Sequence, residues 1–113
     1  MNTKSDTNSM KIAALNDALR QHGTGGKIML TPGIRSLGQK AVNEITAKIR
    51  SFDTFTEDND PYGERDFGSI KVGCNKVFFK IEYYDRNMQY ASPDPADSSV
   101  TVRVMTIMMA DEY

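Results

Sequence analysis

Hydrophobic residues follow a helical spacing in the first half of the chain. Between about residues 10 and 22 they recur on one side of a helix, at Ile12, Leu15 and Leu19. Polar residues fall away from this stripe: Lys11, Asp17, Arg20 and Gln21. Gly23 follows His22, and glycine favours the left-handed conformation that ends helices. The pattern therefore predicts an amphipathic helix that ends at His22.

A second apolar stripe predicts another helix, which begins near Ser36. Its hydrophobic face consists of Leu37, Ala41, Ile45, Ile49 and Phe52. Ser36 and Gln39 have the spacing of a capping box, in which two side chains bind the free N–H groups of a helix start. Before this helix, Lys27 leads into a short strand that reaches Thr31, and Pro32-Gly33 then turns the chain.

Alternating hydrophobic and polar residues predict strands in the second half. Ser69–Val72 and Lys76–Asp85 are expected to form a hairpin that turns at Gly73-Cys74-Asn75. One side of the longer strand should meet the helices through Val77, Phe79, Ile81 and Tyr83. Residues 86–99 form a long loop. The last strand, Val100–Met109, is apolar on both faces, which is typical of a central strand covered on both sides.

These elements predict one α+β domain over residues 10–113, after a disordered lead-in at residues 1–9. Two helices should pack on a mainly antiparallel sheet of about four strands, in the order α-β-α-β-β-β. The predicted core is Ile12, Leu15, Leu19, Ile45, Ile49, Phe79, Ile81, Val102, Val104 and Ile107. The helices suffice to cover one face of the sheet, so the apolar second face of the last strand predicts a homodimer or a docked partner.

Composition limits the compartment and the partners. The single cysteine, Cys74, excludes an intrachain disulfide and favours a reducing, cytoplasmic setting. No apolar run approaches membrane-spanning length, so no membrane partner is predicted. Residues 1–52 hold eight Lys/Arg and three Asp/Glu, whereas residues 53–113 hold six and twelve. A nucleic-acid binder is usually more basic and has clustered cations, so direct nucleic-acid binding is not predicted.

A polar loop at residues 53–68 separates the two halves. Asp60, Pro61 and Gly63 fit the first, second and fourth positions of a type I turn. Acidic residues dominate the loop: Asp53, Glu57, Asp58, Asp60, Glu64 and Asp66. Interspersed aromatic residues are candidates to pin it to the body: Phe55, Tyr62 and Phe67. The simplest interpretation is a well-made turn between a helix and a strand.

Four stretches resemble a known family: Asn59–Gly68, Lys80–Asp85, Ser92–Asp97 and Arg103–Tyr113. The Leu15–Arg20 helix and the Leu30–Gly33 turn belong to the same match. Together they make the chain similar to a family of small bacterial domains of unknown function, scattered among chromosomes, plasmids and phages. That distribution implies a mobile-element accessory or anti-defence role. The family pattern has histidine where this chain has Arg65, which weakens a metal or acid–base role there.

Metal binding lacks essential groups in this sequence. Asp58, Asp60 and Gly63 match part of a calcium-binding loop, but its closing acid would have to be Ser69. One histidine, His22, and one cysteine leave the usual set of zinc ligands unfilled. We therefore predict no metal and no cofactor.

A carboxylate-dependent hydrolase or a nucleotide-binding domain is the alternative function. Its site would need four carboxylates to converge: Glu64, Asp66, Glu82 and Asp85. Asp66 is more simply the ion-pair partner of Arg65 or Arg103. The glycine run before Lys27 does not match the P-loop motif, which needs Ser or Thr after the lysine and then a helix, because here a strand follows. No catalytic residue is assigned, and the balance favours a protein that is not an enzyme.

Protein binding is the favoured function. An acidic loop beside aromatic residues can meet a basic protein surface, such as one that holds nucleic acid, because carboxylates resemble phosphates in sign and spacing. The predicted binding residues are Asp58, Asp60, Tyr62, Glu64, Arg65, Asp66, Phe67, Tyr84 and Asp85. A solvated acidic face without any partner stays open as the alternative.

Overall fold

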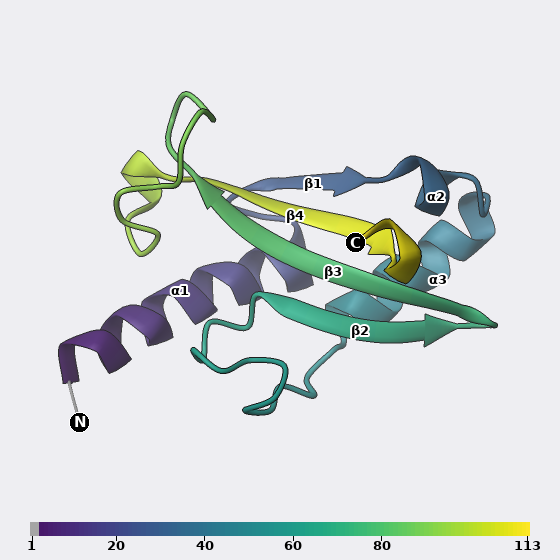
Figure 1. Cartoon of the computed structure of the whole chain (residues 1–113), viewed down its shortest axis with the longest axis horizontal. Coiled ribbons are helices and arrows are strands. Elements are labelled where there is room, and N and C mark those ends of the chain that lie inside the picture. The colour runs from purple at the N-terminus through teal and green to yellow at the C-terminus, as the bar shows by residue number, and fades with distance from the viewer. Residues whose placement is uncertain (1–2) are drawn as a thin grey trace.

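Two long helices lie on one face of a four-stranded sheet, and a short helix precedes the second of them (Figure 1). The computed structural model describes residues 3–113. The helices are α1 (Thr3–His22), α2 (Pro32–Arg35) and α3 (Gln39–Arg50). The strands are β1 (Lys27–Leu30), β2 (Phe67–Val72), β3 (Asn75–Tyr84) and β4 (Val102–Met109). Two 3₁₀ turns flank β4: η1 (Ser98–Val100) and η2 (Ala110–Glu112).

The sheet has the strand order β1-β4-β3-β2. β4 pairs antiparallel with β3, and β3 pairs antiparallel with β2 in a hairpin. β1 runs parallel to β4, which is possible because α2, α3 and the hairpin form a long connection between these two strands. The predicted α+β class, its mainly antiparallel sheet and the central position of the last strand are confirmed.

The hydrophobic core lies between the helices and the inner face of the sheet. Phe79 pairs with Ile107 and Ile81 pairs with Met105, so these side chains project to the same face. The buried cluster comprises Leu19, Ile34, Ile45, Ile49, Val72, Val77, Phe79, Ile81, Met105 and Ile107. Most of the predicted core is confirmed. Two predicted members, Leu15 and Val102, are only half-buried.

α1 begins at Thr3, earlier than the predicted start near Met10, and it ends at His22 as predicted. Residues 1–2 of the expected lead-in lie outside the described residues. Gly23 has a φ of +71°, which is the left-handed cap expected after the helix. Within residues 3–113, no helix combines the length and the apolar character needed to cross a membrane.

The predicted capping box at Ser36 is wrong. Pro32 starts a separate short helix, α2, whose N-cap Thr31 accepts a hydrogen bond from the Ile34 N–H (3.4 Å). Ser36 ends α2, and α3 begins at Gln39 without a side-chain cap. Proline suits a first helical turn because it has no N–H to leave unpaired there. The Pro32-Gly33 segment therefore begins a helix instead of forming an isolated turn.

The outer face of β4 is partly covered by the chain itself. Val104 and Met108 project to this face, away from α1 and α3, and are 7% and 8% exposed. The ring of Tyr113, after η2, lies against Phe78 and Phe67, with centroid distances of 5.7 and 6.2 Å. Val104 and Met108 are therefore buried within a single chain, without a second subunit. The homodimer stays a prediction.

Candidate functional site

The loop between α3 and β2 is anchored by one aromatic residue. Phe55 packs edge-on against Phe52 and Phe79, with ring centroids 4.9 and 6.4 Å apart. The other two aromatic residues of the loop region behave differently. Tyr62 is 79% exposed, and Phe67 belongs to β2 and packs on the outer face of the sheet. Phe55 is therefore the residue that pins the loop to the body.

Asn59 braces the loop from within. Its side-chain oxygen accepts a hydrogen bond from the Thr56 N–H (2.8 Å), and its Nδ2 donates to the Thr54 carbonyl (2.9 Å). The Asp60 N–H donates to the Thr56 carbonyl (2.8 Å). Such side-chain-to-backbone bonds give an irregular segment a defined shape, because its polar backbone groups find partners without a helix or a sheet.

The predicted turn at Asp60 is present, and it uses the Asp60 carboxylate. The Gly63 N–H donates to the Asp60 carbonyl (3.2 Å), which closes the turn. Asp60 Oδ1 accepts hydrogen bonds from the N–H groups of Glu64 and Arg65, both at 3.0 Å. Gly63 and Arg65 have φ values of +69° and +56°. Asp60 therefore shapes the loop, and its charge is already satisfied by the fold.

A partly buried polar cluster lies behind the loop. It consists of Asn16, Glu64, Tyr83 and Arg103 and is called the inner cluster below. Asn16 Nδ2 donates to the Tyr83 hydroxyl (2.8 Å) and to the Glu64 carbonyl (2.9 Å). The Tyr83 hydroxyl donates to Glu64 Oε1 (2.9 Å), and Arg103 Nε donates to Asn16 Oδ1 (2.7 Å). These bonds join α1, the loop, β3 and β4.

Burial shifts the pKa values of two residues of the inner cluster, Tyr83 and Arg103. Asn16 is fully buried and Arg103 is 1% exposed. Burial raises the pKa of Tyr83, because the phenolate would lose its hydration, and its hydrogen bond to Glu64 adds to the effect. Burial also lowers the pKa of the Arg103 guanidinium. Arg103 stacks over the Tyr83 ring (5.1 Å) and donates to the Pro95 carbonyl, so it links the long 86–99 loop to the cluster.

Arg20 was predicted to fall away from the apolar stripe of α1, and that prediction is wrong. Arg20 is 2% exposed, and its guanidinium donates to the Ile49 and Phe52 carbonyls (3.2 and 2.6 Å). The last carbonyls of a helix have no partner within it, so Arg20 satisfies the end of α3. Asp17 binds Arg20 through Oδ1 and Arg65 through Oδ2, both at 2.8 Å.

Asp66 does not form the predicted ion pair with Arg65 or Arg103. Arg65 pairs with Asp17, and Arg103 bonds to neutral oxygens of Asn16 and Pro95. Burial raises the pKa of Asp66, and the nearby carboxylates of the loop raise it further. Asp66 is thus a half-buried carboxyl group without an ion-pair partner within residues 3–113.

The four carboxylates of the hydrolase alternative do not converge. Glu64 contacts Tyr83 on the inner face of the sheet. Glu82 and Tyr84 project to the opposite face, because side chains alternate along β3. Asp85 accepts a hydrogen bond from the Gln89 N–H (3.0 Å) and shapes the next turn. Within residues 3–113, no group of three His, Cys, Asp or Glu side chains is placed to hold a metal ion.

Several exposed side chains of the loop make no internal hydrogen bond within residues 3–113. We call Glu57, Asp58 and Tyr62 the loop tip; all three are exposed, and no internal hydrogen bond of their side chains is found within residues 3–113. Their backbone is held by Asn59 and Asp60. The acidic residues of the loop thus fall into two groups. Asp60 and Glu64 form internal hydrogen bonds, whereas Glu57 and Asp58 are exposed to solvent.

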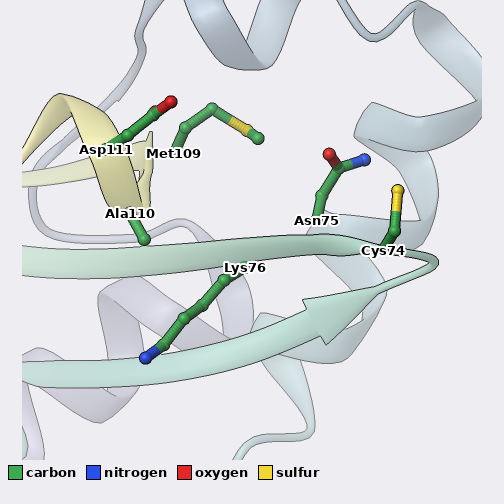
Figure 2. A pocket seen from close by; sticks show the side chains of 6 residues that line it. All are labelled: Cys74, Asn75, Lys76, Met109, Ala110 and Asp111. Carbon is green, nitrogen blue, oxygen red and sulfur yellow. The ribbon is translucent and has the colours of Figure 1, made fainter.

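A hollow of about 280 Å³ lies at the β2–β3 turn, beside the exposed thiol of Cys74. Figure 2 shows Cys74 and Asn75 on one side of the hollow and Met109 and Asp111 on the other. Lys76 points away from these side chains, and its Nζ lies 5.7 Å from the centroid of the Phe78 ring. None of the hollow's lining side chains brings a cation or an imidazole to the thiol.

The fold and the braced loop define a small α+β domain with a preformed polar surface. This chain belongs to the family described as "Protein of unknown function (DUF3768)", whose model matches residues 30–112. The match covers the loop, α2, α3 and β2 to β4, and it does not extend to the Leu15–Arg20 segment of α1. No curated protein matches the chain, and no solved structure matches it.

Proposed function

We propose that this protein is a non-enzymatic binding module that presents the loop tip to a basic surface on a protein partner. The observation that carries the proposal is the division of labour in the loop. Asp60 bonds to backbone N–H groups and Glu64 to Tyr83, whereas Glu57, Asp58 and Tyr62 are left exposed. Exposed side chains on a braced backbone are available to a partner.

Rigidity supports the proposal because binding a flexible loop costs ordering entropy. Asn59 and Asp60 already hold the backbone, and Phe55 fixes the loop to the core. The loop therefore loses little conformational entropy when a partner binds. Tyr62 adds a large, amphipathic ring, the residue type that often forms the energetic centre of an interface.

The contact surface is smaller than the sequence suggested. Glu64 bonds to Tyr83 in the inner cluster, and Asp66 is half-buried. Phe67 is part of β2 and packs against Phe78. We assign these three residues supporting roles. Tyr84 and Asp85 lie on the outer face of β3 and in the following turn. The proposed partner remains a basic protein, in keeping with the mobile-element or anti-defence role that the family resemblance implies.

The test is a capture experiment with matched variants. Glu57→Gln with Asp58→Asn removes two charges from the loop tip. Glu44→Gln with Asp111→Asn removes two charges from exposed positions on α3 and η2 and serves as the control. A partner retained by the wild type and the control, and lost from the loop-tip variant, supports the proposal. Equal retention by all three proteins places the function elsewhere.

A further inference from the structure

A second concave site lies beside the start of β1 and the segment after β3, apart from the loop tip. The cavity has a volume of about 540 Å³. It is lined by Gly25, Gly26, Lys27, Arg86, Ser98, Thr101, Val102 and Arg103. Its size falls within the range of small-molecule sites, which is about 300–1,000 Å³.

The lining of this cavity carries positive charge without a matching acid. Two of the eight lining residues, Lys27 and Arg86, are exposed cations, and none is acidic. The guanidinium of the third cation, Arg103, is engaged in the inner cluster. The one hydrogen-bond partner found for Lys27 Nζ within residues 3–113 is the sulfur of Met88 (3.9 Å). Neither Lys27 nor Arg86 has a carboxylate within ion-pair distance in the same part of the chain, whereas Arg20 and Arg65 are both paired. The cavity thus concentrates unneutralised cations.

The nearest acids along the chain are engaged in shaping their own turns. The Asp85 carboxylate accepts a hydrogen bond from the Gln89 N–H (3.0 Å). The Asp97 carboxylate accepts from both the N–H and the hydroxyl of Ser99 (2.9 and 2.6 Å). These bonds hold the two carboxylates to their own loops, and neither residue lines the cavity.

Neutral donors accompany the cations. The N–H groups of Gly25 and Gly26 donate no hydrogen bond to another group among the described residues. A Cβ at Gly26 would meet the Arg103 carbonyl at 2.5 Å, so this glycine lets the chain pass tightly against β4. Gly25 has a φ of +81° and open space beside it. Ser98, the first residue of η1, lines the same cavity.

We propose that this cavity binds a small phosphate-bearing molecule. A phosphate group accepts several hydrogen bonds at once and pairs with both lysine and arginine. Free backbone N–H groups of a glycine segment are typical donors to phosphate oxygens, also outside a helix start. Lys27 and Arg86 would neutralise the ligand's charge, and Gly25, Gly26 and Ser98 would orient it.

Calorimetric titration with inorganic phosphate, pyrophosphate and a nucleoside triphosphate tests this proposal, at constant ionic strength. Lys27→Gln and Arg86→Gln should each weaken the binding of the tightest of these by about tenfold, since each removes a charge-assisted contact. Lys40→Gln removes the same charge from an exposed position on α3 and should leave the affinity unchanged. Amide resonances of Gly25 and Gly26 should shift on binding.

Three outcomes would overturn the proposal. One is the absence of binding by any of these phosphates at millimolar concentration. Another is binding that Lys27→Gln and Arg86→Gln leave as strong as in the wild type. The third is binding of an oligonucleotide through Lys27 and Arg86 without any binding of the small phosphates, which would assign the cavity to a nucleic-acid backbone instead.

Discussion

The inner cluster and the loop tip lie in or beside the same loop, yet the fold treats their charges in opposite ways. Glu64 is bonded by Tyr83 and sits beside a fully buried Asn16. Asp58, six positions earlier in the chain, is exposed and makes no internal side-chain bond within the described residues. The comparison teaches that a run of acidic residues in a sequence does not define an acidic surface. Each carboxylate has to be assigned from its contacts.

The largest effect is expected from breaking the inner cluster at Asn16. Asn16→Leu removes two donors and one acceptor and leaves the Arg103 guanidinium short of a buried partner. We expect a loss of about 3–5 kcal/mol in the free energy of unfolding, as for other broken buried polar networks. Urea denaturation measures it. A loss below about 1 kcal/mol would mean that the cluster does not hold the loop.

A core substitution is expected to cost a similar or smaller amount. Ile45→Ala removes a fully buried side chain of α3 and leaves a cavity against the sheet. The expected loss is about 2–5 kcal/mol. The exposed substitution Lys40→Ala on the same helix is the control and should change stability by less than about half a kcal/mol. A change that small at Ile45 would contradict its place in the core.

Removing one hydroxyl should have an intermediate effect. Tyr83→Phe keeps the ring that Arg103 covers but deprives Asn16 and Glu64 of their shared partner. We expect a loss of about 1–2 kcal/mol, close to the cost of leaving buried polar groups unpaired. Chemical denaturation of the two proteins at neutral pH measures the difference. An unchanged midpoint would show that water replaces the hydroxyl without cost.

The stability of the protein should depend on pH through Asp66. Its folded-state pKa is raised above the ordinary value by burial, so the folded protein binds a proton more readily than the unfolded chain does. The ionised form therefore lowers stability above the folded pKa, and this penalty shrinks as pH falls from the folded pKa to the ordinary value. Asp66→Asn should stabilise the protein at neutral pH, with a gain that shrinks in acid. A gain that is constant with pH would contradict this assignment.

The smallest effect on stability is expected at the loop tip. Glu57→Gln with Asp58→Asn should change the free energy of unfolding by less than about half a kcal/mol, because both side chains are exposed and make no internal bond within residues 3–113. Thermal unfolding measures this change. A loss comparable to that of Asn16→Leu would show that the tip builds the loop and is not free for a partner.

Patterns of short range predicted much of this molecule. Alternation along β3 correctly assigned Val77, Phe79 and Ile81 to the core, and turn chemistry correctly placed Asp60 and Gly63. The start of α3 was wrong, because Pro32 with its cap Thr31 begins a helix of its own. Local rules succeed where the stabilising contact is close in sequence.

The inner cluster was missed because its contacts are distant in sequence. Asn16 meets Arg103, 87 positions away, and Tyr83, 67 positions away. Asn16 and Arg20 follow Ile12 at a spacing of four, and this was the one local signal that polar residues share the buried side of α1. Hydrophobicity alone assigned Arg20 to solvent, because the carbonyls that it satisfies belong to another helix.

The association rate of the captured partner, measured against salt concentration, tests the central claim most directly. Exposed charges attract a partner over a Debye length of about 8 Å at physiological ionic strength. The account predicts that the wild-type rate falls steeply as salt rises. It also predicts that Glu57→Gln with Asp58→Asn gives a slower rate with a shallower salt dependence, while Glu44→Gln with Asp111→Asn behaves as the wild type. Identical rates and salt dependences for all three proteins would contradict the assignment of the loop tip as the binding surface.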